Sequence, residues 1–252
     1  MRRFLCAMPH SLFISDLHLC SNTQNTTRRF HNFVQRIAPE AEALYILGDL
    51  FEYWAGDDDL DSPFHLEITH ALRTLSTQGT SIHIMHGNRD FLMDKLLAES
   101  CNATLLADPL LIDLYGTLTL LTHGDALCTD DIAYQTFRRQ VRDTTWQQQF
   151  LALPLAQRKS QIEQLRAKSE AEKQHKTMSI MDVNLQAVNE LLHEYYYPRL
   201  IHGHTHRPAH HVHHIDGHTC DRWVLGDWDN YANALRCDEN SATWEIFPFD
   251  GL

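Results

Sequence analysis

Residue types that can bind a metal ion follow directly after several short apolar runs of this sequence. The run Tyr45-Ile46-Leu47 is closed by Gly48 and Asp49. Such a run is typical of a buried strand. An unpaired carboxylate cannot lie in the core, because desolvating an anion costs several kcal/mol or more. Asp49 therefore lies at the rim of the fold, although on its own it is explained equally well as a helix cap.

Four further apolar runs also end in polar residues, and this repetition favours a shared site over a helix cap at Asp49. The first is followed by Asp16 and His18, and later runs are followed by Asn88, by His123, and by the pair His204 and His206. Five repetitions of one pattern predict a metal site.

The donor types indicate which ions this site suits. Carboxylate, imidazole and amide groups without a thiolate suit Mn²⁺, Fe²⁺ or Zn²⁺ and disfavour a structural cysteine-type zinc site. Seven candidate ligands exceed what one ion needs, so two ions bridged by Asp49 fit the count. Two ions about 3.5–4 Å apart polarise a phosphoryl group and generate hydroxide near neutral pH. The predicted chemistry is hydrolysis of a phosphate ester or anhydride by in-line attack.

Length and composition limit the setting of this site. The chain has 252 residues, 43% hydrophobic and 21% charged, which predicts one sizeable soluble domain or one domain with an insertion. No apolar run approaches the roughly 18 residues of a membrane span, and Pro9 interrupts the N-terminal apolar stretch too early for a secretory signal. Six cysteines without CxxC spacing indicate free thiols in a reducing cytoplasm. The net charge of −12 argues against general nucleic-acid binding.

The elements that must position the candidate ligands alternate along the chain. Helices are expected at 26–37, at 64–75 and from Phe91. The expected strands are 5–19, 43–51, 82–86, 104–106, 118–122, 199–202, 211–215, 222–226 and 243–247. This alternation predicts an α/β core with helices covering central strands.

One segment, 131–192, breaks the alternation. It has helical spacing and no strand candidate, and nine Lys and Arg against four Asp and Glu lie between Ile132 and Lys176. We interpret it as a helical cap inserted into a core formed by 1–130 and 193–252, because it is too short for a large core of its own.

These motifs resemble those of the calcineurin-like metallophosphoesterases. The chain carries the family's motifs in order: Asp16-Leu17-His18, Gly48-Asp49, Gly87-Asn88-Arg89-Asp90, His123 and Gly203-His204-Thr205-His206. The resemblance implies a four-layer α/β/β/α sandwich. It also implies that one ion is bound by Asp16, His18, Asp49 and His206, and the other by Asp49, Asn88, His123 and His204. The implied catalytic residues are Asp49, Asn88, Arg89 and His123.

Arg89 departs from most of that superfamily, which has a histidine there to assist the leaving group. A guanidinium, with a pKa above about 12, is a poor proton donor but binds phosphate well. A phosphoanhydride releases a stable phosphate anion without such an acid. We therefore expect a pyrophosphate substrate rather than an alkyl phosphomonoester.

Four longer segments, 87–91, 123–131, 181–184 and 202–208, closely resemble the UDP-2,3-diacylglucosamine hydrolases. That narrower family implies Mn²⁺-dependent attack at the α-phosphate of UDP-2,3-diacylglucosamine, giving UMP and 2,3-diacylglucosamine 1-phosphate in lipid A biosynthesis. It further implies a cytoplasmic protein at the periphery of the inner membrane, and we favour a monomer. The implied substrate contacts are Asn88, Arg89, Asp131, Ser169, Lys173, Lys176 and His204.

Other interpretations stay open at this point. The cap could line a slot for acyl chains, or it could be an ordinary helix pair with a solvated basic face. Another binuclear phosphohydrolase, such as a cyclic-nucleotide phosphodiesterase, is an alternative, and a scaffold kept for protein binding would predict eroded ligands. We interpret 57–59 as a solvated turn, Cys128 as a packed thiol, and the histidines between His210 and His218 as exposed on a hairpin.

Overall fold

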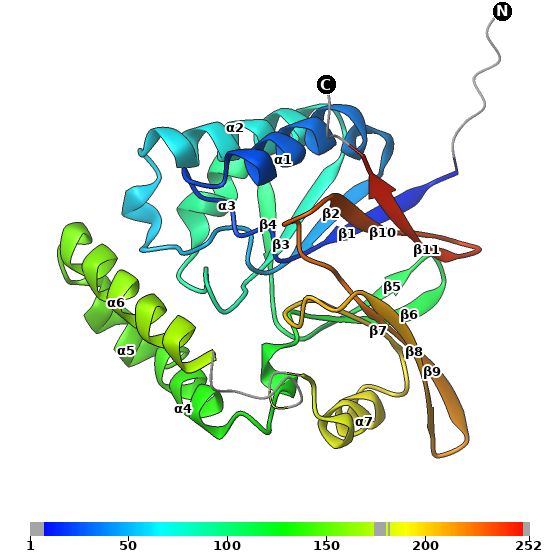
Figure 1. Cartoon of the computed structure of the whole chain (residues 1–252). Coiled ribbons are helices and arrows are strands. Elements are labelled where there is room, and N and C mark those ends of the chain that lie inside the picture. The colour runs from blue at the N-terminus through cyan, green and yellow to red at the C-terminus, as the bar shows by residue number, and fades with distance from the viewer. Residues whose placement is uncertain (1–7, 174–179, 181, 249–252) are drawn as a thin grey trace, which may run out of the picture.

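The computed structural model describes residues 8–173, 180 and 182–248, and its strands form two sheets (Figure 1). The first sheet has the order β11-β10-β1-β2-β3-β4 and the second β5-β6-β7-β9-β8. Strands of the first sheet are β1 His10–Ile14, β2 Ala43–Leu47, β3 Ser81–Met85, β4 Ala103–Leu106, β10 Ala232–Asp238 and β11 Ala242–Phe247. Those of the second are β5 Leu110–Leu114, β6 Thr117–Thr122, β7 Arg199–His202, β8 Ala209–Ile215 and β9 His218–Val224.

Helices α1 Gln24–Arg36, α2 Pro63–Thr77 and α3 Lys95–Cys101 cover the outer face of the first sheet. The apolar residues of α1 recur at helical spacing, so Phe30 and Phe33 point together into the core, where both are fully buried. Ser62 starts α2 by accepting a hydrogen bond from the His65 N–H, and Pro63 occupies its first turn.

The two sheets face each other, and α7 Leu185–Glu194 covers the far side of the second sheet. Phe13 and Met85 of the first sheet belong to the same buried cluster as Leu121 and Ile201 of the second. Val188 and Leu192 of α7 are buried against the second sheet's other face. These layers confirm the predicted α/β/β/α sandwich.

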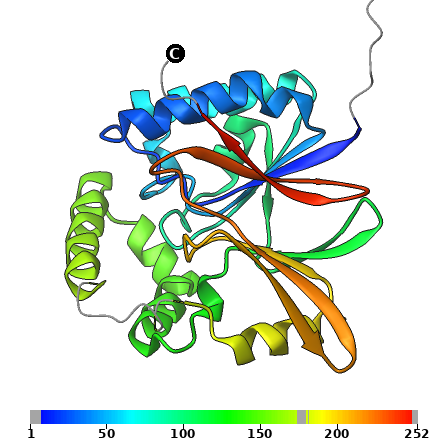
Figure 2. The same cartoon turned by 45° about the vertical axis from the view of Figure 1, so that its right-hand side comes forward.

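Helices α4 Ile132–Val141, α5 Thr144–Leu151 and α6 Leu155–Lys173 lie together beside the sandwich (Figure 2). The division into a core and a 131–192 cap stays a prediction. That interval also contains most of α7, which packs on a sheet as one layer of the sandwich. From here on, "cap" means α4, α5 and α6.

The cap is attached to the core through the acidic turn at 57–59. Arg158 of α6 is only 2% exposed and donates hydrogen bonds to the Asp58 carboxylate and to the carbonyl oxygens of Ala55 and Leu153. Lys159 Nζ lies 2.6 Å from Asp59 Oδ1. The interpretation of this turn as merely solvated is wrong, because basic side chains of α6 pair with two of its carboxylates.

Strands β5 and β10 were not predicted from the sequence, and α3 begins four residues later than expected. In β10, the sequence Ala-Asn-Ala-Leu-Arg-Cys-Asp lacks β-branched residues, so it carries little strand signal. Strict alternation is missing because this inner strand, between β11 and β1, is buried on both faces.

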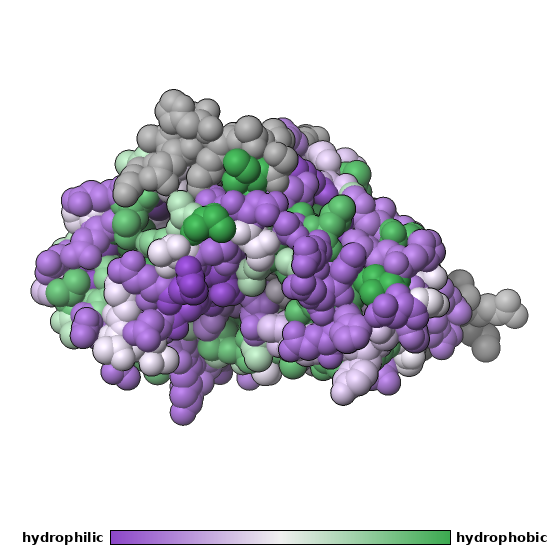
Figure 3. Space-filling view, turned by 90° about the horizontal axis from the view of Figure 1, so that it is seen from below, coloured by the Kyte–Doolittle hydropathy of each residue, from purple (hydrophilic) through white to green (hydrophobic). Residues whose placement is uncertain are grey.

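Three features of the molecule bear on possible partners. Within the described ranges, no helix is both long and apolar enough to cross a membrane. The face seen from below in Figure 3 is mainly hydrophilic, with small separate apolar areas. The β8–β9 hairpin exposes His210, His211, His214 and His218, as predicted, whereas His213 is half-buried with its Nδ1 3.1 Å from Asn189 Oδ1.

Candidate active site

The predicted ligands lie where strands β1, β2, β3, β6 and β7 end, at one rim of the sandwich. Five of the seven have positive φ angles, between 49° and 70°: Asp16, His18, Asp49, His204 and His206. L-residues seldom adopt this left-handed conformation, and such strain persists only where the surroundings enforce it. Turning the backbone this way directs several side chains toward one point.

One group of side chains meets between the ends of β1 and β7. Nε2 of His206 lies 3.4 Å from Asp16 Oδ1 and 3.3 Å from Nε2 of His18. Nε2 of His18 is in turn 3.9 Å from Asp49 Oδ2. Imidazole nitrogens and carboxylate oxygens therefore point at a common centre.

A second group lies on the other side of Asp49. Nε2 of His123 is 3.9 Å from the same oxygen, Asp49 Oδ2, and 3.1 Å from Asn88 Oδ1. Nδ1 of His204 lies 2.8 Å from that Asn88 oxygen. Asp49 Oδ2 is thus equally distant from Nε2 of His18 and Nε2 of His123, so this one carboxylate faces both groups of side chains.

The residues of both groups fit divalent cations. Asp16 and Asp49 are 1% and 2% exposed, and Asp16 Oδ1 accepts no hydrogen bond from the described residues. The backbone of Gly87 lies close to the Asp49 carboxylate: a Cβ added at Gly87 would lie 2.0 Å from Asp49 Oδ1, so only glycine fits there. Buried carboxylates among histidines, without a thiolate, are the donor set of Mn²⁺, Fe²⁺ or Zn²⁺.

Local charges shift the pKa values of these histidines in different directions. Burial opposes protonation of His206, but Asp16 and Asp227 raise its pKa to about 10. Burial likewise opposes protonation of His123, and Asp49 and Asp16 raise its pKa to about 9. Burial and then the neighbouring His123 lower the pKa of His204 to about 4. The carboxylates thus attract positive charge to this rim, as a cation site requires.

Three contacts orient the histidines from behind. Glu52 Oε2 lies 3.2 Å from Nδ1 of His18, and Asp227 Oδ2 lies 3.2 Å from Nδ1 of His206. His123 has its Nδ1 2.9 Å from the Leu47 carbonyl oxygen. Partners of this kind fix the ring and leave Nε2 for an ion. Sequence reasoning missed Glu52 and Asp227; Glu52 lies three residues after Asp49, and Asp227 has no signal in the pattern.

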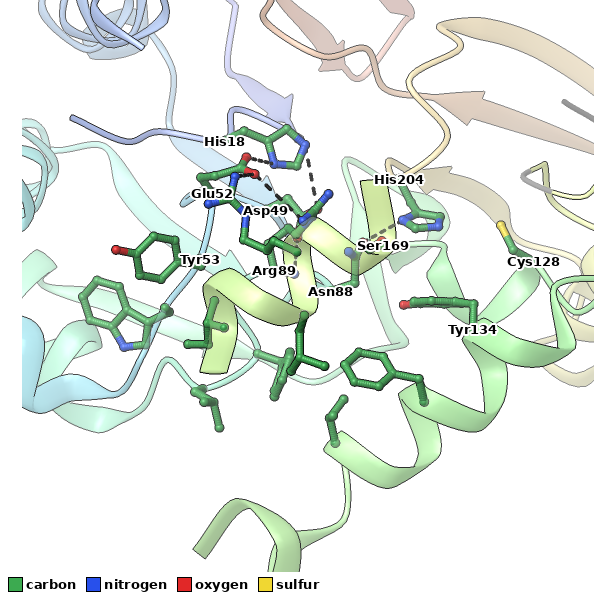
Figure 4. Close-up of a pocket in the computed structure, with 18 of the residues that line it drawn as sticks. His18, Asp49, Glu52, Tyr53, Asn88, Arg89, Cys128, Tyr134, Ser169 and His204 are labelled. Atoms are coloured by element: carbon green, nitrogen blue, oxygen red, sulfur yellow. Dashed lines mark hydrogen bonds and ion pairs between the residues drawn. The ribbon is translucent and has the colours of Figure 1, made fainter. Parts of the chain in front are cut away.

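A cavity of about 680 Å³ opens from this rim toward the cap (Figure 4). His18, Asp49, Asn88, Arg89, His204 and His206 line its polar end. A wall of apolar side chains, which we call the slot, lines the rest: Phe91, Leu92, Phe137, Val141, Trp146, Phe150, Ile162 and Leu165. One cavity is therefore lined both by five of the seven candidate ligands and by a large apolar surface.

Helix α6 contributes one face to this cavity. Ile162, Leu165, Arg166 and Ser169 all line it, at the spacing of residues on one side of a helix. Arg166 was not predicted; Ser169 was predicted to contact substrate and lines the cavity. Lys173 ends α6, but its side chain and the whole of Lys176 lie outside the described residues.

Helix α4 contributes the opposite wall. Asp131 lines the cavity and also caps α4, accepting a hydrogen bond from the Tyr134 N–H. Tyr134, which sequence reasoning missed, stacks on His204 with ring centroids 5.9 Å apart and donates a hydrogen bond to Asp125. Cys128 is 2% exposed, and burial raises the pKa of its thiol to about 12, as expected for a packed thiol.

Comparison with known proteins identifies the family. The family model for calcineurin-like phosphoesterases matches residues 10–208. A UDP-2,3-diacylglucosamine hydrolase from Aromatoleum aromaticum is 56% identical over 228 residues, covering 90% of this chain and 93% of that protein. Proteins of the same name from Aeromonas hydrophila and Haemophilus influenzae are 46% and 47% identical, over 90% and 92% of this chain and 94% and 97% of those proteins. The chain therefore belongs to the calcineurin-like phosphoesterases and, within them, to the family of UDP-2,3-diacylglucosamine hydrolases.

Proposed function

We propose that this protein hydrolyses the pyrophosphate bond of UDP-2,3-diacylglucosamine by water attack on the α-phosphate. The products are UMP and 2,3-diacylglucosamine 1-phosphate, in a step of lipid A biosynthesis. The observation that carries this proposal is the single cavity that joins the candidate ligands to the apolar slot. The identity of the relatives, 46–56% over most of the chain, supports the same substrate.

We assign the seven predicted ligands to two Mn²⁺ ions that share Asp49. The first set is Asp16, His18, Asp49 and His206, and the second is Asp49, Asn88, His123 and His204. When bound, such ions polarise a phosphoryl group and make hydroxide available near neutral pH.

The chain's own residues have the task of holding the diphosphate in line. The Arg89 N–H donates to Asp49 Oδ1 at 2.8 Å, which keeps the backbone of the Asn88-Arg89 turn against the ligand cluster. The guanidinium of Arg89 lines the cavity and can bind the leaving phosphate through charged hydrogen bonds. Because that phosphate leaves as a stable anion, Arg89 does not have to donate a proton.

We assign the slot to the acyl chains, because its wall is made of apolar side chains. Pockets of about 300–1,000 Å³ bury most of a small ligand, and this cavity is within that range. We assign Asp131, Ser169, Lys173 and Lys176 of the cap region, with Asn88, Arg89 and His204 of the core, as substrate contacts. The cap then selects the lipid, and the core carries out the hydrolysis.

A substrate with two acyl chains resides in a membrane, so we place the protein at the cytoplasmic face of the inner membrane as a peripheral monomer. Exposed apolar side chains such as Ile132, 70% exposed at the start of α4, support contact with a lipid surface. The net charge of −12 supports the expectation that nucleic acid is not a partner.

Substrate preference and metal dependence test this proposal together. Turnover of UDP-2,3-diacylglucosamine should cease after chelation and return with Mn²⁺, and it should exceed turnover of a simple alkyl phosphomonoester. Equal or faster hydrolysis of the monoester would contradict the pyrophosphate assignment. Lipid hydrolysis that survives chelation would contradict the metal assignment.

A further inference from the structure

Glu52 contacts three functional side chains at once. It follows Asp49 by three residues, is half-buried, and lines the cavity between His18 and Arg89 (Figure 4). Oε2 lies 3.2 Å from Nδ1 of His18, an ion-pair contact without hydrogen-bond geometry, whereas Oε1 lies 3.9 Å from Arg89 Nη1 and accepts a hydrogen bond from Nη2 of Arg166. One oxygen therefore faces a candidate ligand, and the other faces two guanidinium groups.

The two arginines come from different parts of the molecule. Arg89 follows β3 of the core, and Arg166 lies on α6 of the cap. Both guanidinium groups converge on Oε1 of Glu52. A planar guanidinium matches phosphate geometry and donates charged hydrogen bonds to phosphate oxygens, so this pair can also bind an anion.

The guanidinium of Arg166 is oriented by its neighbours and has an N–H donor that could bind a further acceptor. Its guanidinium carbon lies 5.7 Å from the centroid of the Tyr53 ring, which fixes its orientation from the side. Its buried Nε–H donates to no acceptor among the described residues, which is rare for a buried polar atom. An N–H donor in this position suits an incoming oxygen.

We propose that Glu52 is a positioning residue with two roles, resting on the proposed function for the identity of the anion. Through Oε2 it orients His18 toward the first ion. Through Oε1 it holds Arg89 and Arg166 at the spacing of a clamp for the diphosphate, whose oxygens displace the carboxylate on binding. Glu52 thus supports the ion and competes with the substrate for the same pair of arginines.

These two roles predict effects of opposite sign in Glu52→Gln. Loss of the carboxylate behind His18 should weaken Mn²⁺ binding about tenfold, the usual effect of removing a partner of a metal-binding histidine. At saturating Mn²⁺, however, the variant should bind imidodiphosphate, a non-hydrolysable pyrophosphate analogue, roughly threefold to tenfold more tightly. The reason is that the arginines are no longer held by a competing carboxylate.

Arg166→Gln separates the roles, because Arg166 does not touch His18. This variant should bind Mn²⁺ as the unmodified protein does but bind imidodiphosphate about tenfold more weakly. In the double variant the gain from Glu52→Gln should disappear. Glu67→Gln is the matched control: it removes a glutamate that lies 2.7 Å from His31 beside a separate shallow cavity, and should change neither titration.

Calorimetric titrations with Mn²⁺, and then with imidodiphosphate, measure both affinities and test the two roles of Glu52 without the lipid substrate. Unchanged Mn²⁺ affinity in Glu52→Gln, or unchanged or weaker imidodiphosphate binding at saturating Mn²⁺, would overturn the inference. Failure to hydrolyse UDP-2,3-diacylglucosamine is a separate result, which would overturn the proposed function while leaving these titrations interpretable.

Discussion

The ligand cluster and the slot share one cavity but are built differently. Each ligand follows a strand of the sandwich, and for five of the seven a left-handed backbone turns the side chain toward the others. The slot instead consists of apolar faces of α4, α5 and α6 set against Phe91 and Leu92. One site is fixed by backbone turns at the strand ends of both sheets, the other by the packing of helices.

This difference suggests that hydrolysis and substrate recognition are carried out by different parts of the molecule. A centre held by five strand ends suits chemistry that every phosphoryl substrate needs, whereas a wall of helix faces suits recognition of one apolar group. Substitutions in the cluster should therefore affect all substrates, and substitutions in the slot should affect only the lipid.

The largest effect is expected for Asp49→Asn, which removes the charge shared by both ligand groups. Turnover of UDP-2,3-diacylglucosamine and of a soluble aryl phosphodiester should both fall by at least about 1,000-fold, because several kcal/mol of charge stabilisation is lost. Steady-state kinetics at saturating Mn²⁺ measure this. The exposed Asp61→Asn is the control. Soluble-substrate turnover that persists in Asp49→Asn would show that the cluster is not the common centre.

Leu165→Glu should separate the two regions. Leu165 lines the slot but is 41% exposed, so the variant should fold. A charge in the slot should lower kcat/KM for the lipid about 10-fold to 100-fold, since one to three kcal/mol of apolar contact is lost. Hydrolysis of the soluble phosphodiester should be unchanged. Leu185→Glu, at an exposed position on α7, is the matched control; equal losses on both substrates would remove the distinction.

Arg158→Met tests whether the cap's attachment is separate from the site. The change leaves the carbonyl oxygens of Ala55 and Leu153 without this donor, so the free energy of unfolding should fall by about 1–3 kcal/mol. Denaturant titration measures the loss, and Arg158→Lys, which keeps the charge, should lose less. Asp58 is largely solvated, so its share in the loss should be small. Unchanged stability in Arg158→Met would show that this contact does not hold the cap.

Asp131 gives the smallest expected effect on stability and a sharp test of its role. Asp131→Ala should destabilise the protein by about 1 kcal/mol through loss of the α4 cap, whereas Asp131→Ser should restore most of it. If the carboxylate also contacts substrate, KM for the lipid should be raised in both variants. An unchanged KM in Asp131→Ser would show that Asp131 only caps α4 and does not contact the substrate.

The cluster could be predicted from the sequence because each ligand directly follows the strand that positions it. The local pattern of an apolar run and a polar end therefore carries three-dimensional information, and five such ends suffice to predict the centre. Asp227 was not predicted because it does not follow the strand that positions its partner His206. It contacts His206 from another segment, whose sequence carries no such pattern.

The slot was harder to predict for a physical reason. Ile162 and Leu165 have the spacing of any amphipathic helix, and the sequence does not say whether that face meets protein or a cavity. Ion pairs between segments that are far apart in the chain are equally hard to predict from the sequence. Arg158 and Asp58 are 100 residues apart in the chain, so their contact could not be inferred and the acidic turn was misinterpreted.

The most direct test of the central claim is mass spectrometry of the products formed from UDP-2,3-diacylglucosamine in ¹⁸O-labelled water, with and without Mn²⁺. Mn²⁺-dependent formation of UMP that carries the label is predicted, which establishes the substrate and attack at the α-phosphate together. Label in 2,3-diacylglucosamine 1-phosphate instead would contradict the site of attack. No turnover of the lipid, with clear hydrolysis of a soluble phosphodiester, would contradict the assignment of the slot to acyl chains.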